Sequence, residues 1–385
     1  MTVLHNSYFI SSSPGDAAVR SRHLLDDIDS HTSDSATRAT MTTAPTVAPP
    51  RAALIKTPAW SRRRRFDRVR RGGDRGSPVA SASSSSDRSN LAASNLRELL
   101  AGDEILRAPC AHDALTAALI ERAGFKVGFM SGFCVSAARL AMPDAGLISY
   151  GEMEDVGRHI TQATSAGFPF IGDADDGYGN AMNAKRTVRG YARAGFAGIL
   201  MEDQRAPKAC GHTKPRCLGR DEAVARVRAA CDERDEGPGG DIVVFARSDS
   251  RSAMDSLDEA LWRVAAFADA GADALFVDAL RTKDELRAFC KAVPGTPKMA
   301  NMLEGGGRTP ICSPEELQDM GFSVVAYPLT VLGAYVNATE RALREIKEDG
   351  YPDESKLPTF ESLKATCGFP GYYADAERYD VTSGK

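Results

Sequence analysis

The sequence lacks several features that would place it in a specialised class of protein. Its eight cysteines include no Cys-x-x-Cys pair and no paired His/Cys spacing, which excludes the common zinc sites and favours reduced thiols over a disulfide framework. No apolar run approaches the roughly 20 residues that a membrane-spanning helix requires. The 48 basic and 52 acidic residues leave a net charge of −4, so no overall positive field indicates nucleic-acid binding. We therefore expect neither a membrane nor a nucleic acid as a partner.

The first ninety residues lack glutamate, because the first one in the chain is Glu98. This segment is rich in Ser, Thr, Ala and Arg and shows little apolar periodicity, so it cannot bury enough surface to offset the entropy of ordering. A leader of this composition is typical of an organelle transit peptide. We predict that residues 1–90 are a disordered leader to the chloroplast, with the mitochondrion as the alternative destination and a disordered cytosolic tail as the alternative role. The aspartates at 26, 27 and 29 are unusual in such a leader and leave Met41 as an alternative start.

From residue 94 the pattern changes to alternating apolar strands and helices. The predicted strands are continuous apolar runs, which is typical of strands buried on both faces of a parallel sheet. They lie at 105–109, 127–131, 168–173, 198–202, 241–247, 272–278, 298–303 and 323–327. The predicted helices lie at 96–101, 114–123, 135–140, 184–194, 221–233, 257–270, 283–292, 314–320 and 332–349. Several of them are followed by Ala-Gly, where glycine provides a left-handed cap.

Eight strand–helix units in about 250 residues match a (β/α)8 barrel in size and order. A doubly wound open sheet is the alternative, but no glycine-rich phosphate loop follows the first strand, which favours the barrel. We therefore predict an α/β fold of the TIM-barrel type over residues 94–350, followed by a C-terminal tail at 351–385.

Polar side chains stand at the end of almost every predicted strand, where a barrel places its chemistry. They are His112, Asp113, Ser131, Asp173, Asp175, Asp176, Glu202, Asp203, Arg247, Asp249, Asp278, Asn301, Glu304 and Tyr327. Some of them can cap the helices that follow. The run GDADDG at 172–177 is harder to explain in this way, since its three carboxylates repel one another unless a cation neutralises them. Ligands that offer only oxygen favour a hard ion, so we predict a Mg²⁺ site here, with Mn²⁺ as the alternative metal.

The stretch 199–212 is dense in groups that transfer protons, since Glu202 is followed by Lys208, Cys210 and His212. Nearby positive charge lowers the pKa of a thiol, which would make Cys210 usable as an acid or base. The alternative is a polar surface loop with a chance cysteine. Gly211 and a second glycine downstream favour a flexible lid.

The fifth predicted strand ends in Arg247, whose planar guanidinium suits a substrate carboxylate or phosphonate. An internal salt bridge to Glu202 or Asp278 is the alternative, and the two roles are compatible. Four further cysteines are interpreted as buried filler, namely Cys110, Cys231, Cys290 and Cys367.

Taken in order and spacing, these motifs resemble the isocitrate lyase/phosphoenolpyruvate mutase superfamily over residues 96–346. The likeness rests on SG at 131–132, MPDAG at 142–146, DAD at 173–175, LMEDQ at 200–204, PKACGH at 207–212, ARSD at 246–249 and NMLEGG at 301–306. It extends to three branches, the 2-methylisocitrate lyases, the carboxyvinyl-carboxyphosphonate phosphorylmutases and the plant petal death protein. The resemblance implies a barrel whose last helix is swapped between the subunits of a homotetramer.

The resemblance also implies the residues of a site. One Mg²⁺ would be held largely through water by Asp144, Asp173, Asp175 and Glu202, with Asp175 as the direct ligand. The oxo acid end of the substrate would be bound by Ser131, Gly132 and Phe133, with Arg247 on a carboxylate or phosphonate. The remaining substrate contacts would be Gly211, Asp278 and Asn301. The catalytic set would be Lys208, Cys210, His212, Arg247 and Glu202, in which Cys210 protonates the departing enolate.

The implied function is that of a Mg²⁺-dependent lyase, which cleaves a C–C bond of a 2-hydroxy acid such as a 2-methylisocitrate- or malate-like substrate through an enolate. Carboxyvinyl-carboxyphosphonate phosphorylmutase, a phosphonomutase, is the first alternative. An oxaloacetate-type hydrolase or an inactive binding member is the second. Ala209 replaces a lysine of the lyase loop, and Asp278 stands where lyases have glutamate, so the small carboxylate or phosphonate substrate stays open.

Overall fold

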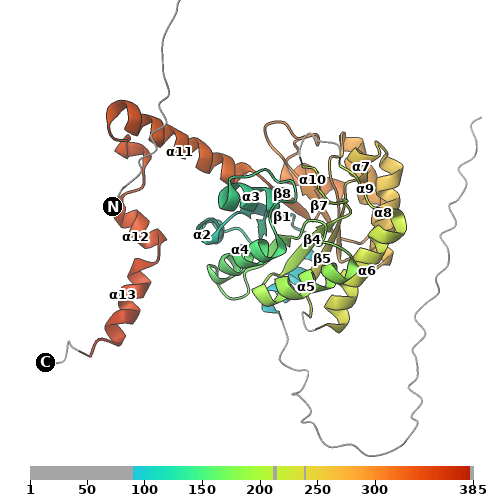
Figure 1. Ribbon diagram of the computed structural model, residues 1–385, viewed down its shortest axis with the longest axis horizontal. Helices are drawn as coiled ribbons and strands as arrows, with labels where there is room; N and C mark the ends of the chain where they lie inside the picture. Colours follow the sequence, from blue (N-terminus) through green and yellow to red (C-terminus); the bar gives the residue numbers. More distant parts are fainter. Residues whose placement is uncertain (1–89, 211–214, 238–239, 382–385) are drawn as a thin grey trace, which may run out of the picture. The chain divides into compact units, whose positions relative to one another are not determined.

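A computed structural model describes residues 90–210, 215–237 and 240–381. Within these residues, eight parallel strands close into a barrel in the order β1 to β8, with β1 paired to β8 (Figure 1). The strands are β1 Leu106–Ala111, β2 Gly128–Met130, β3 Phe170–Asp173, β4 Gly198–Glu202, β5 Val243–Ser248, β6 Ala274–Val277, β7 Lys298–Asn301 and β8 Val324–Tyr327. The prediction of a (β/α)8 barrel is confirmed, and closure of the sheet excludes the doubly wound alternative.

Helices alternate with the strands and surround the barrel (Figure 1). They are α2 Ala114–Arg122, α3 Gly132–Leu140, α4 Tyr150–Gln162, α5 Ala181–Ala194, α6 Arg220–Glu236, α7 Ser250–Ala253, α8 Leu257–Asp269, α9 Lys283–Ala292, α10 Pro314–Met320 and α11 Thr330–Asp349. Gly195 ends α5 with a φ of 97°, as expected of glycine after a helix. The predicted third and fifth strands begin earlier than β3 and β5 do.

Two apolar clusters hold the fold together. One lies inside the barrel and includes Leu106, Phe245 and Phe276. It is continued by Leu96 of α1 (Leu91–Leu100), a helix tied to the amino-terminal side of the strands by hydrogen bonds such as Asn90 Nδ2 to the Phe196 carbonyl, 2.7 Å. The other cluster fills the layer between strands and helices. With one end occupied by α1, the carboxyl ends of the strands remain for chemistry.

Sequence analysis did not predict α4 or the short helix α7. The start of α4 carries a readable signal, because Ser149 and Glu152 form a capping box. Its interior glycine weakens the helical pattern, and that glycine has a packing role. A Cβ atom at Gly157 would lie 2.3 Å from the ring of Phe196, so only glycine lets α4 approach the barrel this closely.

The C-terminal part of the chain contains helices beyond the barrel. Along the length of α11 only Leu332 is buried, and the tail continues as η1 (Glu354–Lys356), α12 (Phe360–Thr366) and α13 (Phe369–Arg378). Large apolar side chains on these helices are exposed, among them Leu343, Ile346 and Phe360. The exchange of the last helix between subunits therefore stays a prediction that this surface makes reasonable.

Two of the cysteines interpreted as buried filler differ from that interpretation. Cys110 and Cys231 are buried, but Cys290 is partly exposed and Cys367 is exposed. Cys367 is exposed because it belongs to the tail, which packs little against the barrel.

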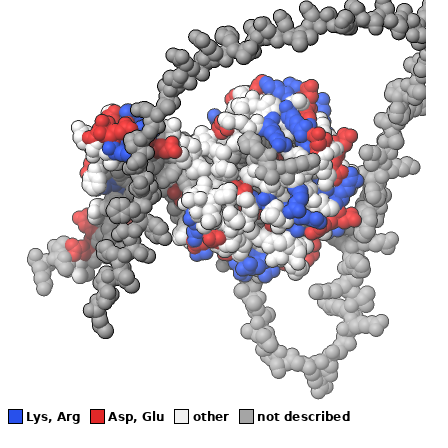
Figure 2. Space-filling model, turned by 45° about the horizontal axis from the view of Figure 1, so that its top comes forward, with Lys and Arg blue, Asp and Glu red and all other residues white. Residues whose placement is uncertain are grey.

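No helix among the described residues is both long and apolar enough to cross a membrane. On the face that Figure 2 shows, basic and acidic side chains are interspersed around the barrel.

Candidate active site

The closed parallel barrel brings the predicted polar strand ends to one side of the molecule. Strand pairing sets Glu202 of β4 directly beside Arg247 of β5, and Asp173 of β3 beside the strand that carries Glu202. Asn301 ends β7, and Asp278 follows β6. Those residues of the predicted metal and substrate site that the structure describes thus share one end of the barrel, as the fold requires.

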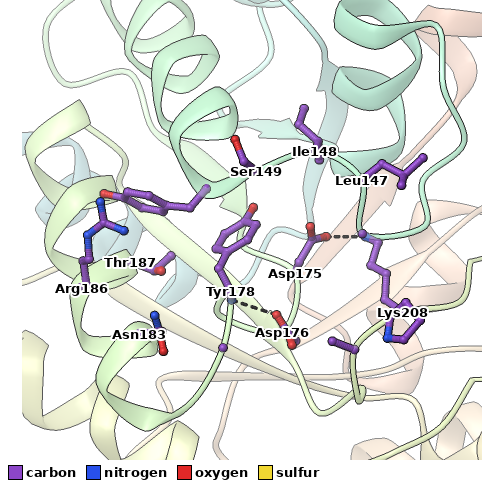
Figure 3. Close-up of a pocket in the computed structure, with 15 residues that line it drawn as sticks. Leu147, Ile148, Ser149, Asp175, Asp176, Tyr178, Asn183, Arg186, Thr187 and Lys208 are labelled. Atoms are coloured by element: carbon purple, nitrogen blue, oxygen red, sulfur yellow. Dashed lines mark hydrogen bonds and ion pairs between the residues drawn. The ribbon is translucent and has the colours of Figure 1, made fainter.

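The carboxylates of Asp144, Asp173 and Asp175 form an acidic cluster, and the buried side chain of Lys208 lies at its centre. Its Nζ lies 2.7 Å from Asp144 Oδ1 and also forms an ion pair with Asp175, which Figure 3 shows. The side chains are only 7% exposed for Lys208, 6% for Asp144 and 4% for Asp175. Segments following β2, β3 and β4 therefore converge on one ammonium group. The sequence analysis assigned Lys208 to a lid and did not predict this pairing.

Asp173 is oriented by backbone amides. The amide of Gly132 donates to Asp173 Oδ2 at 2.9 Å, and the amide of Asp175 donates to Oδ1 at 3.1 Å. A Cβ atom at Gly132 would lie 2.8 Å from Asp173 Oδ2, so a larger residue here would displace this carboxylate. Asp175 itself has a φ of 48°, which non-glycine residues seldom adopt and which is often found at functional sites. Two of the predicted substrate-binding groups already have hydrogen-bond partners. The amide of Gly132 donates to Asp173, and Ser131 Oγ accepts from the amide of Cys134.

Arg247 forms a network of carboxylate contacts. Its Nε and Nη2 donate to the two oxygens of Asp249 at 2.9 and 2.7 Å. Its Nε also lies 3.3 Å from Glu202 Oε2, and its Nη2 lies 3.4 Å from Asp278 Oδ2. Glu202 and Asp278, the two residues predicted as salt-bridge partners of Arg247, therefore both contact it. Asp249, which was noted only as a strand-end residue, is the partner that sequence reasoning missed, although its spacing of two from Arg247 was a readable signal.

Burial shifts the ionisation of these groups. Desolvation raises the pKa of Asp175 to about 7, although Lys208 opposes the shift. It also raises the pKa of Glu202 well above its usual value, against the effect of Arg247. Burial by itself would lower the pKa of Lys208, but Asp175 and Glu202, with the other nearby acids, outweigh it and hold that pKa well above its usual value. The acids of this site need a cation in order to ionise at neutral pH.

The side chains suit a hard metal cation held by few direct bonds. Glu202 Oε1 is buried without a hydrogen-bond partner, and the atoms nearby that could bind a metal are carboxylate oxygens. In the part of the chain that the structure describes, no three His, Cys, Asp or Glu side chains come close enough to form a metal site by themselves. Such a donor set matches Mg²⁺, which keeps several waters and uses few carboxylates.

Cys210 is exposed and lies beside the acidic cluster. Desolvation raises the pKa of its thiol, and the nearby Asp144 carboxylate adds to this effect, whereas Lys208 and Arg247 oppose it. The prediction that the pKa of this thiol is lowered is therefore wrong, because desolvation and the Asp144 carboxylate outweigh the effect of the nearby positive charge. The predicted site residues Gly211 and His212 lie outside the described residues.

A pocket of about 480 Å³ opens beside Asp175 and Lys208 (Figure 3). Its other walls come from the start of α4, the loop after Asp175 and the side chain of Arg186, which stacks on Tyr150 at 4.4 Å. Sequence reasoning did not predict this pocket, because it depends on α4. It places free space directly next to the acidic cluster.

Comparison with known proteins agrees with this geometry. The family model for phosphoenolpyruvate phosphomutase matches residues 96–347. Carboxyvinyl-carboxyphosphonate phosphorylmutase of Arabidopsis thaliana, described as chloroplastic, is 39% identical over 280 residues, which covers 71% of this chain and 81% of the relative. The 2,3-dimethylmalate lyase of Eubacterium barkeri is 40% identical over 258 residues, covering 67% of this chain and 86% of the relative.

Solved structures give the same assignment. A crystal structure of 2,3-dimethylmalate lyase has a TM-score of 0.70 at 34% identity, covering 76% of this chain and 95% of that one. Phosphonopyruvate hydrolase in complex with oxalate and Mg²⁺ has a TM-score of 0.67 at 31% identity, covering 75% and 99%. The relatives include lyases and phosphonomutases, so the predicted class of enzyme is confirmed. This chain belongs to the phosphoenolpyruvate mutase/isocitrate lyase family.

Proposed function

We propose that this enzyme is a Mg²⁺-dependent lyase that cleaves a C–C bond of a 2-methylisocitrate- or malate-like 2-hydroxy acid. The observation that carries the proposal is the exposed cysteine Cys210, whose thiol lies beside the buried acid Asp144. A lyase of this type needs a proton donor for the enolate that leaves, whereas a phosphonomutase does not. The similarity to 2,3-dimethylmalate lyase supports the same substrate class.

The carboxylates of Asp144, Asp173, Asp175 and Glu202 would hold the metal, with Asp175 binding it directly. Bound Mg²⁺, or Mn²⁺ in its place, supplies positive charge that stabilises a developing enolate oxygen. Glu202 Oε1 is buried without a hydrogen-bond partner, and we assign it as the acceptor of the substrate hydroxyl proton.

The remaining residues bind and protonate. Arg247 presents its guanidinium to a substrate carboxylate while Asp249 fixes its orientation through two hydrogen bonds. Cys210 then donates the Sγ proton to the enolate carbon. A raised thiol pKa suits this role, because the thiol stays protonated at neutral pH until the carbanion forms. The backbone of 131–133 would hold the oxo acid end of the substrate. Asp278, Asn301 and Gly211 would provide the remaining substrate contacts. Lys208 and His212 remain in the proposed catalytic set.

A phosphonomutase is the second candidate, since a phosphorylmutase is 39% identical to this chain. Asp278, in contact with Arg247, is shorter than the glutamate that lyases have there, which changes how far this carboxylate reaches toward a substrate. Arg247 itself suits a phosphonate as well as a carboxylate.

The test is a substrate panel on the Mg²⁺-loaded protein, with readouts for pyruvate, glyoxylate and phosphonate products. Cys210→Ser should abolish C–C cleavage, by at least 100-fold in kcat, while Mg²⁺ affinity stays within twofold. Cys217→Ser is the matched control, because Cys217 is a partly exposed thiol of the same segment whose Sγ contacts Asp203 and not the acidic cluster. Unchanged turnover in Cys210→Ser would remove the acid role. Conversion of carboxyphosphonoenolpyruvate without cleavage of any hydroxy acid would favour the mutase.

We further propose a chloroplast location and a homotetramer. The chloroplastic relative supports the first, and the exposed apolar side chains of α11 and the tail support the second. Residues 1–89 lie outside the described part of the chain, so the leader stays a prediction. Fluorescence imaging of the tagged full chain tests the location.

A further inference from the structure

Lys208 occupies the position of a bound cation in the acidic cluster. Its ammonium contacts the carboxylates of Asp144 and Asp175, and these three side chains are almost completely buried. Burial of a charge is strongly unfavourable unless an opposite charge meets it. The ammonium of Lys208 therefore acts as the internal counter-ion of Asp144 and Asp175.

The other cation of the site cannot replace Lys208 in this role. The guanidinium of Arg247 is engaged by Asp249, Glu202 and Asp278. Among the described residues, Lys208 is the only cationic group with an ion pair to Asp144 or Asp175. Loss of its charge would leave these two carboxylates buried without a cation.

A metal ion and the ammonium would compete for the same oxygens. Mg²⁺ binds carboxylate oxygen at about 2.0–2.1 Å, and Lys208 Nζ already contacts Oδ1 of Asp175, the proposed direct ligand. Two cations on one oxygen would lie within a few ångströms of each other in a site with little solvent, where their repulsion is strong. We propose that Lys208 is a built-in substitute for the metal, and that metal binding requires its side chain to leave the acidic cluster. This inference rests on the proposed function, since it concerns the proposed metal site.

The structure provides space for the displaced side chain. The pocket of about 480 Å³ is lined by Lys208 itself and by Gly146, Pro207 and Tyr178 (Figure 3). Its opening to solvent lets the long lysine side chain turn out of the cluster. Metal occupancy is thereby coupled to the position of a residue in the proposed catalytic set, so a metal-free enzyme holds that residue away from substrate.

The first test follows Lys208 in the unaltered protein. Acetylation by an amine-reactive ester, read by peptide mass spectrometry, should be slow at Lys208 without metal and at least fivefold faster with saturating Mg²⁺. Lys298 is the internal control, since it is also buried and donates to the carbonyls of Val293 and Thr296, and it lies far in the sequence from every proposed metal ligand. Its labelling should not respond to Mg²⁺. A Lys208 rate that is the same with and without bound Mg²⁺ would overturn the exchange.

The second test uses Lys208→Met, which keeps the length of the side chain and removes its charge. Isothermal titration should show Mg²⁺ binding at least tenfold tighter than in the parent, because no internal cation has to be displaced. The metal-free variant should melt at a lower temperature and gain more from Mg²⁺. Lys298→Met should also melt lower but bind Mg²⁺ as the parent does.

The outcomes separate the two proposals. Equal or weaker Mg²⁺ affinity in Lys208→Met, in a parent that cleaves hydroxy acids, would overturn the exchange and leave the proposed function intact. Absence of Mg²⁺ binding in both proteins would overturn both. Binding by Lys208→Met alone would support the exchange and show that Lys208 blocks the site.

Discussion

At the scale of single residues, Gly132 shows how little room the acidic cluster leaves. A Cβ atom there would lie 2.8 Å from Asp173 Oδ2 and 3.3 Å from Asp175 Oδ1. An added Cβ atom would therefore push at least one of these carboxylates aside. Both are proposed to hold the metal, so the metal site would be disturbed. Such overpacking costs about 1–3 kcal/mol.

We predict that Gly132→Ala weakens Mg²⁺ binding at least tenfold and lowers the free energy of unfolding by about 1–3 kcal/mol. Isothermal titration and urea unfolding measure the two effects. Gly151→Ala is the control, since a Cβ atom there meets nothing within 4 Å and the residue lies in α4, where alanine favours the helix. Parent-like Mg²⁺ affinity in Gly132→Ala would contradict the assignment of Asp173 and Asp175 to the metal.

Residue types and their order were sufficient to predict the acids and the arginine of the site. They could not predict which charges pair. Asp144 and Lys208 are 64 positions apart in the chain, and only the folded loops bring their side chains together. For the same reason the pKa of Cys210 was predicted in the wrong direction, because the sequence shows the nearby lysine but neither the desolvation of the thiol nor the Asp144 carboxylate beside it.

At the scale of elements, an ion pair joins α7 to α9 on the outside of the barrel. Arg251 donates to both oxygens of Glu285, at 3.0 and 2.7 Å. The hydrogen bond from Arg251 holds the pKa of Glu285 below its usual value. A carboxyl whose pKa is lower in the folded state adds stability above its unfolded pKa, and that stability is lost as the pH falls through the folded pKa.

We predict that Glu285→Gln lowers the free energy of unfolding at pH 7 by about 1 kcal/mol, because the neutral amide loses the charge of this pair but can still accept a hydrogen bond from Arg251. At pH 3 the difference from the parent should shrink, because stability that the ionised carboxyl adds is lost as the pH falls from its usual pKa toward the lowered pKa of the folded state. Urea unfolding at both pH values gives the comparison. A loss that is equal at pH 7 and pH 3 would mean that packing, and not charge, holds α7 to α9.

Each predicted strand corresponds to a strand of the barrel, although several ends differ by one or two residues, whereas α4, α7 and the helices of the tail were not predicted. The helix α4 was missed because its apolar stripe is interrupted by Gly157, whose role depends on the ring of Phe196. Since α4 also forms one wall of the pocket beside Lys208, the missed helix is the reason that the pocket was missed.

At the scale of the whole molecule, the barrel is self-contained, whereas α11 and the tail expose apolar surface. Leu343 is 60% exposed and Ile346 is 46% exposed on α11. Contiguous apolar surface of this kind marks interaction sites. A second copy of the chain is the partner that the proposed tetramer supplies.

We predict that the double variant Leu343→Glu with Ile346→Glu reduces the tetramer to smaller species while the barrel stays folded. Light scattering during size-exclusion chromatography measures the mass, and circular dichroism measures the fold. Lys347→Glu, a charge reversal on the same helix, should leave the mass unchanged. A double variant with the mass of the parent would show that this face of α11 does not form the interface.

The sequence by itself determined the barrel, its eight-fold order and the set of acids, arginine and cysteine at the strand ends. Strand burial and strand-end chemistry are local properties, written in continuous apolar runs and in the residues that follow them. Only the tertiary structure decided that Lys208 lies between Asp144 and Asp175, that Asp249 orients Arg247, and that a pocket opens beside them. Each of these depends on which loops meet in space, and the energy of a buried charge is set by all the groups around it.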